Sequence, residues 1–255
     1  MGSFVLKIRR GETPFYRRLK VLAHNVRSSN FPLPRFFNPV LRAGYHVFHG
    51  LEVAIRWSLA YFIFEPLFRG RCEAVGKRFR CTRLPWVVGQ PKIYIGDDVN
   101  FFGNVDIFSG SQLDQPRLVL KDRVDIGHNV IFMVNREIVL EEDVNVASGV
   151  RFMDSDAHPR DTMARIADLP ASPDEIKAVR IKRYAWIGHN SFIMKGVTVG
   201  EGSIIGVNSV VLNDIPDYSV AIGNPARVIV KNINRTTGAA AAASAASEAR
   251  TEASK

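Results

Sequence analysis

The chain has 255 residues, of which 46% are hydrophobic and 23% charged, so its length and composition fit one large globular domain with extensions. The formal net charge of +9 is uneven: residues 1–92 carry 17 Lys/Arg and 4 Asp/Glu, and residues 93–255 carry 17 Lys/Arg and 21 Asp/Glu. This asymmetry predicts either an anionic partner for the first third of the chain or a solvated basic face. We do not expect a nucleic acid, because no nucleic-acid-binding motif accompanies the charge.

Two cysteines, Cys72 and Cys81, are too few for a disulfide framework, and their spacing is not that of a zinc site. We therefore expect a reducing, cytoplasmic setting and no metal. The first 20 residues contain scattered basic residues and lack the apolar core of a secretory signal peptide.

In chain order, residues 1–40 are basic and interrupted by prolines, so we expect irregular structure with one short helix. Residues 41–69 are expected to be helical. Their most apolar part is interrupted by Glu52, Arg56 and Glu65, and the longest uncharged run, residues 57–64, is too short to span a bilayer. This amphipathic helix is predicted either to pack on the main domain or to lie in a membrane interface.

From about residue 75 to residue 211, aliphatic or aromatic residues recur at every sixth position, a period of neither an α-helix nor an ordinary strand. A chain that turns a corner every six residues, with three sides to a coil, has this period. The repeat therefore predicts a parallel β-helix of triangular section with stacked inward side chains. The longest series are Leu120, Ile126, Phe132, Ile138 and Ile181, Ile187, Ile193, Val199, Ile205, Val211.

Glycine often follows the inward residue, as at Gly96, Gly127, Gly188 and Gly206, which predicts corners with positive φ. A closing segment, residues 212–235, comes after the repeats. The Ala/Ser-rich residues 236–255 are of low complexity and are expected to be disordered. The predicted organisation is thus a basic, partly helical extension (1–70), the β-helix (71–232) and a disordered tail (233–255).

One histidine, His158, stands where the chain leaves the six-residue rhythm, close to Asp154 and Asp156. Imidazole is well suited to remove a proton from an alcohol near neutral pH, and a nearby carboxylate would orient the ring. Asp154 and Asp156 are nearest in sequence, and Asp143 could approach from another coil. A loop histidine held by its neighbours is the non-catalytic alternative.

Three motifs make the sequence similar to the hexapeptide-repeat acyltransferases: FMDSDAHP (152–159), AWIGHNSFIMKGVTVGEGSIIGVNSVV (185–211) and DIPDYSVAIGNPARVI (214–229). The resemblance covers about residues 70–232 and is closest to bacterial polysaccharide O-acetyltransferases and to maltose and galactoside acetyltransferases. It implies a mainly β protein folded as a left-handed parallel β-helix, and a homotrimer with acetyl-CoA bound between adjacent β-helices. It also implies that His158 is the general base on the acceptor hydroxyl.

The same resemblance implies a donor site for acetyl-CoA. An exposed indole would pack near the CoA arm, backbone groups after it would bind the pantetheine and the developing oxyanion, and a basic side chain would lie near the adenosine phosphate. The matching residues are Trp186, Gly188, His189, Gly206, Val207 and Arg227.

The chain departs from the family at Leu212 and Asn213, where many relatives have Thr-Lys. A neutral asparagine cannot neutralise a phosphate, which leaves Arg227 and Lys231 for that role.

Acceptor-binding residues are also implied. Asn135 stands in FMVN, where related sugar acetyltransferases have an acceptor-binding asparagine. The insertion 160–180 follows His158 and is expected to overhang the cleft, where loops commonly set substrate choice. Arg165 in this insertion could hold the loop itself or an acidic sugar.

The leading hypothesis is an acetyl-CoA-dependent O-acetyltransferase that modifies a sugar hydroxyl of a cell-envelope or exopolysaccharide precursor, with the basic N-terminus in peripheral contact with the membrane. One alternative is an N-acyltransferase on an amino sugar or antibiotic, which would use the same base and donor groove. A metal enzyme of the carbonic-anhydrase type would need three histidines, and the close histidine pair expected on one coil is missing. The last alternative is a non-catalytic β-helix that serves in assembly.

Overall fold

The computed structural model describes residues 2–11, 13–28, 34–110 and 112–233. Contacts divide the chain into two compact units, residues 1–53 and 54–255, which are taken separately below. The predicted disordered tail lies outside the described residues, apart from Ile233.

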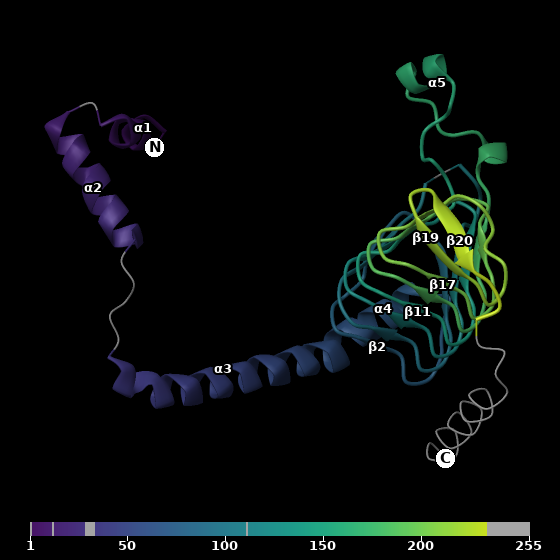
Figure 1. Cartoon of the computed structure of the whole chain (residues 1–255), viewed down its shortest axis with the longest axis horizontal. Coiled ribbons are helices and arrows are strands. Elements are labelled where there is room, and N and C mark those ends of the chain that lie inside the picture. The colour runs from purple at the N-terminus through teal and green to yellow at the C-terminus, as the bar shows by residue number, and fades with distance from the viewer. Residues whose placement is uncertain (1, 12, 29–33, 111, 234–255) are drawn as a thin grey trace. The chain divides into compact units, whose positions relative to one another are not determined.

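The second unit is built from stacked triangular coils (Figure 1), and the predicted left-handed parallel β-helix is confirmed. Its strands form three sheets, which we name A, B and C in the order in which each coil visits them. Their pairings are parallel, except that the last two strands of sheet B form an antiparallel pair. Sheet A contains β1 (Ala74–Val75), β4 (Lys92–Ile95), β7 (Arg117–Leu120), β10 (Glu137–Leu140), β13 (Val179–Ile181) and β16 (Thr198–Val199). Sheet B contains β2 (Arg80–Cys81), β5 (Asn100–Phe101), β8 (Asp125–Ile126), β11 (Asn145–Val146), β14 (Trp186–Ile187), β17 (Ile204–Ile205), β19 (Val220–Gly223) and β20 (Ala226–Val230). Sheet C contains β3 (Trp86–Val88), β6 (Val105–Phe108), β9 (Val130–Met133), β12 (Arg151–Met153), β15 (Phe192–Ile193) and β18 (Val210–Val211).

The inward positions of the six-residue repeat form the core. Leu120, Leu140, Ile181 and Val199 lie in register on successive strands of sheet A, and all four are buried. Each fully buried side chain of this kind contributes about 1.5–3 kcal/mol relative to exposure. The parallel register therefore follows from the period, because a slip by one residue would turn the inward set outward.

The glycines after the inward residues do not have positive φ, contrary to the expectation from the sequence. Positive φ falls two residues later, for example at Asn190 and Asn208. Gly188 is needed for a different reason: a Cβ on it would lie 2.5 Å from the carbonyl oxygen of Ile205 in the next coil. Asparagine tolerates the left-handed region better than most residues. At each such corner the glycine therefore allows the next coil to approach, and the asparagine two residues later takes the positive φ.

A short helix, α4 (Glu65–Arg71), covers the N-terminal end of the β-helix core. Its Phe68 is buried, with ring centroids 5.5 Å from Phe79 and 5.9 Å from Phe101. The π-helical turn Ala60–Phe64 precedes α4, and Ala60 is also buried. The segment after Leu59 therefore packs on the β-helix, which is the first of the two placements predicted for this helix.

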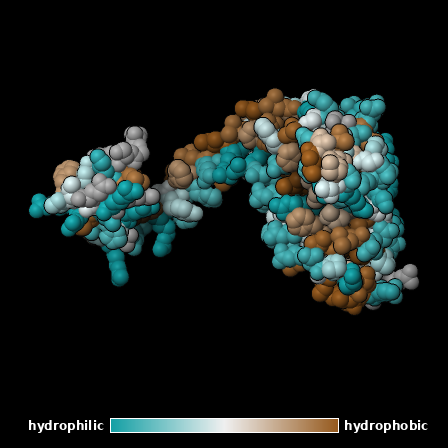
Figure 2. Space-filling model, turned by 90° about the horizontal axis from the view of Figure 1, so that it is seen from above, coloured by the Kyte–Doolittle hydropathy of each residue, from teal (hydrophilic) through white to brown (hydrophobic). Residues whose placement is uncertain are grey.

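The helix before this segment is exposed along its length. Helix α3 (Asn38–Leu59) follows a 3₁₀ turn (Arg35–Phe37) and has no buried residue. The continuous helix Arg35–Arg71 is long and apolar enough to cross a membrane by length and composition, although the eight-residue uncharged run alone was too short. Figure 2 shows hydrophobic residues gathered along this exposed helix.

Two further helices, α1 (Gly2–Arg10) and α2 (Pro14–Ser28), lie in the first unit, where the sequence was expected to be irregular with one short helix. In α2, apolar residues recur at helical spacing, at Phe15, Leu19, Leu22 and Val26. That pattern predicts an amphipathic helix. The sequence analysis missed it because many basic residues lie between these apolar ones.

Candidate functional site

The corner that leads from sheet C to sheet A, here the C–A corner, carries the candidate catalytic residues. It comprises residues 109–116, 134–136, 154–178 and 194–197 of successive coils. His158 follows β12 on this corner and Asn135 follows β9, one coil earlier. The break in the repeat therefore predicted the place of His158 in the fold, whereas Asn135 was expected from the family resemblance.

Asp154 is buried at this corner and binds the preceding coil. Its carboxylate accepts hydrogen bonds from the backbone amides of Asn135 (2.8 and 3.0 Å), Arg136 (2.7 Å) and Glu137 (2.9 Å), and from Asn135 Nδ2 (3.3 Å). Burial raises the pKa of Asp154, and these hydrogen bonds oppose the rise. The contacts make Asp154 a support for residues 135–137, a role that differs from the predicted one of orienting His158.

Replacement of Asp154 by alanine should strongly destabilise the protein. Three backbone amides would lose their acceptor in a buried place, at about 1–3 kcal/mol each, so we expect a loss of about 3–5 kcal/mol. For a domain of this size that corresponds to a fall in Tm of about 10 °C, measurable by thermal unfolding. Asp122→Ala is the matched control, since Asp122 accepts one backbone amide, from Asp97 at 2.8 Å, and should cost about 1 kcal/mol. Equal effects of the two substitutions would contradict the role of Asp154.

Asn135 is also occupied within the corner. Its Oδ1 accepts from the backbone amide of Gly110 at 2.8 Å while its Nδ2 donates to Asp154, so its amide links three coils. The side chain is buried. These contacts position Asn135 at the predicted acceptor side of the site and use much of its hydrogen-bonding capacity.

His158 itself is exposed, and within the described residues its side chain makes no hydrogen bond or ion pair. Asp156 lies two residues before it and pairs instead with Lys195 Nζ at 2.6 Å and Arg160 at 3.7 Å. The third candidate carboxylate, Asp143, lies on a different corner, between sheets A and B, and pairs there with Arg123 at 2.7 Å. The imidazole is thus presented outward from a turn whose carboxylates are paired with other groups.

The insertion after His158 leaves the coils as an arm that contains α5 (Thr162–Ile166) and a 3₁₀ turn (Pro173–Glu175) (Figure 1). Two roles were left open for Arg165, holding the loop itself or binding an acidic sugar, and the contacts in the structure are those of a residue that holds the loop. Its guanidinium donates to the carbonyls of Pro159 (2.9 Å) and Arg160 (2.5 Å) and so holds the base of the arm.

The predicted donor residues lie on sheet B and on the corner between sheets B and C. Trp186 is in β14 with 52% of its surface exposed, and Gly188 and His189 follow it. Gly206 and Val207 occupy the equivalent place one coil later, because β14 pairs with β17. Arg227, in β20 of the same sheet, is exposed.

The predicted catalytic and donor residues therefore lie at opposite edges of sheet C. His158 follows β12 on the C–A corner, whereas Gly188 and Val207 precede β15 and β18 on the B–C corner. The width of sheet C, two to four residues, separates them by on the order of 10 Å. One chain by itself does not bring the two groups together.

The outer face of sheet C carries an apolar column that the sequence analysis missed. Val88, Phe108, Met133 and Met153 lie in register on successive strands. Met194 and Leu212 continue the column at the ends of β15 and β18. The available signal was an apolar residue directly after the inward residue of every third six-residue unit.

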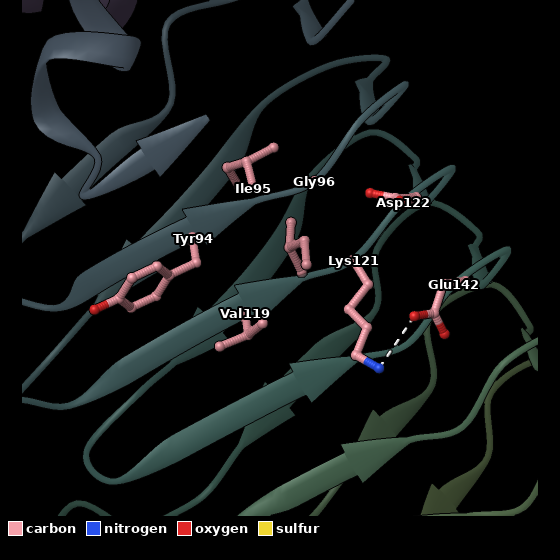
Figure 3. Close-up of a pocket in the computed structure, with 8 residues that line it drawn as sticks. Tyr94, Ile95, Gly96, Val119, Lys121, Asp122 and Glu142 are labelled. Carbon is pink, nitrogen blue, oxygen red and sulfur yellow. Dashed lines mark ion pairs between the residues drawn. The ribbon is translucent and has the colours of Figure 1, made fainter. Parts of the chain in front are cut away.

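A shallow hollow on sheet A, shown in Figure 3, contains none of the predicted site residues. It lies over β4 and β7, where Tyr94 and Val119 point outward and Lys121 pairs with Glu142 at 3.1 Å.

Within the part of the chain that the structure describes, no group of three or more His, Cys, Asp or Glu side chains could hold a metal ion. Burial raises the pKa of Cys72 and of Cys81 to about 12, so both thiols are protonated at neutral pH.

Comparisons with known proteins agree with this architecture. The family model for the bacterial transferase hexapeptide (six repeats) matches residues 178–213. A probable acetyltransferase of Mycobacterium tuberculosis, Rv3034c, is 27% identical over 74% of this chain and 65% of its own length. A putative acetyltransferase of Saccharomyces cerevisiae, YJL218W, is 32% identical over 45% of this chain and 56% of its own. The alignments thus span about two thirds or less of these relatives.

Among solved structures, AntD, an N-acyltransferase from Bacillus cereus in complex with dTDP and 3-hydroxybutyryl-CoA, is similar with a TM-score of 0.54. It is 18% identical, over 72% of this chain and 95% of AntD. Fold and repeat define a left-handed β-helix of hexapeptide repeats. The match to the family model identifies hexapeptide repeats of the bacterial transferase type at residues 178–213, and the chain is similar in sequence to acetyltransferases.

Proposed function

We propose that the protein is an acetyl-CoA-dependent O-acetyltransferase that modifies a sugar hydroxyl of a cell-envelope or exopolysaccharide precursor. The observation that carries this proposal is the exposed imidazole of His158, which projects from a turn that Asp154 and Lys195 anchor to neighbouring coils. A neutral imidazole would take the hydroxyl proton as the oxygen attacks the thioester carbonyl. The carbon–sulfur bond then breaks, and the proton passes to the departing CoA thiolate.

Several donor-site residues fit a CoA arm. Trp186 offers an exposed ring beside the B–C corner, where Gly188 and Gly206 let successive coils approach closely and His189 and Val207 follow them. Leu212 and Asn213 provide no charge for a phosphate, whereas Arg227 and Lys231 are exposed cations on the closing hairpin and after it. When bound, acetyl-CoA supplies the activated acetyl group.

The site also supports a homotrimer. Since His158 and the donor residues lie at opposite edges of sheet C, a complete site needs the catalytic edge of one chain and the donor edge of a neighbour. The apolar column from Val88 to Leu212 lies between those edges and would be buried by such packing.

The N-terminal helices support contact with an anionic membrane from the cytoplasmic side. In α2, the basic face Arg17, Lys20, His24 and Arg27 and the apolar face Phe15, Leu19, Leu22 and Val26 follow helical spacing. Along the continuous helix Arg35–Arg71, Arg35, Arg42, His49 and Arg56 recur every seventh residue on one side. Such a polar stripe favours a helix lying in the interface over one that crosses the bilayer.

An N-acyltransferase on an amino sugar is the second candidate. The observation that favours it is the fold similarity to AntD, whose description is that of an N-acyltransferase. The same base and groove would act on an amine, so the acceptor alone distinguishes the two activities.

Release of free thiol from acetyl-CoA tests the proposal. We expect the purified protein to consume acetyl-CoA with one member of a panel of free and lipid-linked glycans, and the product to be an alkali-labile ester. An alkali-stable amide would favour the second candidate. Failure to bind CoA at all would contradict both and favour a non-catalytic assembly role.

A further inference from the structure

Lys195 is an unusually enclosed cation at the C–A corner. It follows β15, and its side chain is only 11% exposed. Lysine is seldom enclosed without a partner. Here the partner is Asp156, whose Oδ2 lies 2.6 Å from Nζ, and the two residues are 39 positions apart in the chain.

The pair reaches the turn that carries His158 from a different coil. At its start, the turn is fixed by the backbone of Asp154, whose carbonyl accepts from Lys177 at 2.9 Å. At its end, Arg165 holds the carbonyl of Pro159. Between them, Asp156 is held by Lys195, and Arg160, the other cation beside Asp156, belongs to the same loop and lies farther away at 3.7 Å.

The middle of this turn is also strained. Ala157 has φ +65°, a conformation that costs a residue with a Cβ of order 1 kcal/mol or more and persists only where surrounding contacts enforce it. Its backbone amide donates to Ser155 Oγ at 3.0 Å, inside the turn. A contact from outside is therefore needed to keep the residue before His158 in place, and the Asp156–Lys195 pair supplies one.

We infer that Lys195 is a positioning residue for His158, acting through Asp156 to hold the imidazole at the angle that catalysis requires. The inference rests on the proposed role of His158 as general base. It also gives Asp156 a task other than orienting the ring by direct contact.

The test compares full-chain variants. Lys195→Met should lower kcat by about ten- to a hundredfold, because misplacement of a catalytic group by about 1 Å has effects of this size, and should leave KM for acetyl-CoA unchanged. Lys195→Arg should restore most of the rate. Lys182→Met is the matched control, since Lys182 pairs with Asp217 at 2.9 Å away from the C–A corner, and should behave as wild type.

A second readout does not depend on turnover. Hydrogen exchange of the peptide 154–161 should be faster in Lys195→Met than in the wild type and the control, and Asp156→Asn, which breaks the same pair from the other side, should repeat the effect. The inference would be overturned if exchange were unchanged in Lys195→Met, or if the substitution changed KM for acetyl-CoA without lowering kcat. If exchange is faster in Lys195→Met as expected, but the wild type shows no turnover that depends on His158, the result would instead contradict the proposed function.

Discussion

His158→Ala should lower kcat by at least about 10²–10⁴-fold with little change in KM for acetyl-CoA, because general-base assistance by a positioned side chain contributes that much. The side chain is exposed and makes no hydrogen bond or ion pair with the described residues, so its removal should leave the fold intact. Thiol release from acetyl-CoA and the thermal unfolding temperature together separate loss of chemistry from loss of structure.

His128→Ala is the matched control for that substitution. His128 is likewise an exposed histidine of the β-helix, but it follows β8, two strands from β14 in sheet B. It should retain wild-type activity. Comparable losses in both variants would remove the case for His158 as the base.

Mixing the His158→Ala chain with a variant of the donor side tests whether each active site is formed by two neighbouring chains. Val207→Trp should block the groove, since Val207 is 63% exposed and a larger side chain there does not disturb the core. If each site takes His158 from one chain and the groove from its neighbour, randomly reassembled trimers should regain about one quarter of the wild-type activity. A mixture no more active than its separate components would place both halves of the site in one chain.

Lys20→Glu combined with Arg27→Glu should weaken binding to anionic vesicles by at least about thirtyfold, because each basic residue near such a surface contributes about 1 kcal/mol. Both residues are exposed on the basic face of α2. Binding is measured by sedimentation with phosphatidylcholine vesicles that contain phosphatidylglycerol. Vesicles of phosphatidylcholine alone should bind the wild type weakly.

The control for charge is the pair Lys77→Glu and Arg83→Glu, which reverses two exposed basic residues of the β-helix unit. It should bind nearly as wild type if the N-terminal helices make the contact. Equal losses in both double variants would show that net charge alone governs binding. Substitution is preferable to deletion of residues 1–70, because deletion would remove Phe68 from the end of the core.

Extraction separates a helix in the interface from one that crosses the bilayer. The regular stripe of Arg35, Arg42, His49 and Arg56 would be costly inside hydrocarbon and favourable at a charged surface. We therefore expect high salt to release part of the protein and alkaline carbonate to release nearly all of it. Retention after carbonate would mean that the helix Arg35–Arg71 spans the membrane.

The sequence by itself determined the β-helix and the location of the candidate site. A period of six leaves one inward side chain per side of each coil, so the core residues from Leu120 to Val211 could be read directly. The departure from that period marked the turn with His158. Both conclusions rest on local patterns, which need no knowledge of which residues meet across the fold.

Other features were decided by the tertiary structure, because they depend on contacts between successive coils. The partners of Asp154 are the amides of residues 135–137, and the partner of Asp156 is Lys195, far away in sequence. No local pattern could have assigned them. The same holds for Gly188, where a larger residue would clash with the next coil. The sequence analysis had instead expected a positive φ at this glycine.

The separation of the predicted site residues onto two edges of sheet C also became clear only in three dimensions. His158 and Val207 belong to the same β-helix, yet the triangular section places sheet C between them. The physical reason is that the six-residue period fixes which side chains point inward on each side of a coil. Which outward side chains lie near one another depends on the path of the chain at the corners, and the period does not contain that information.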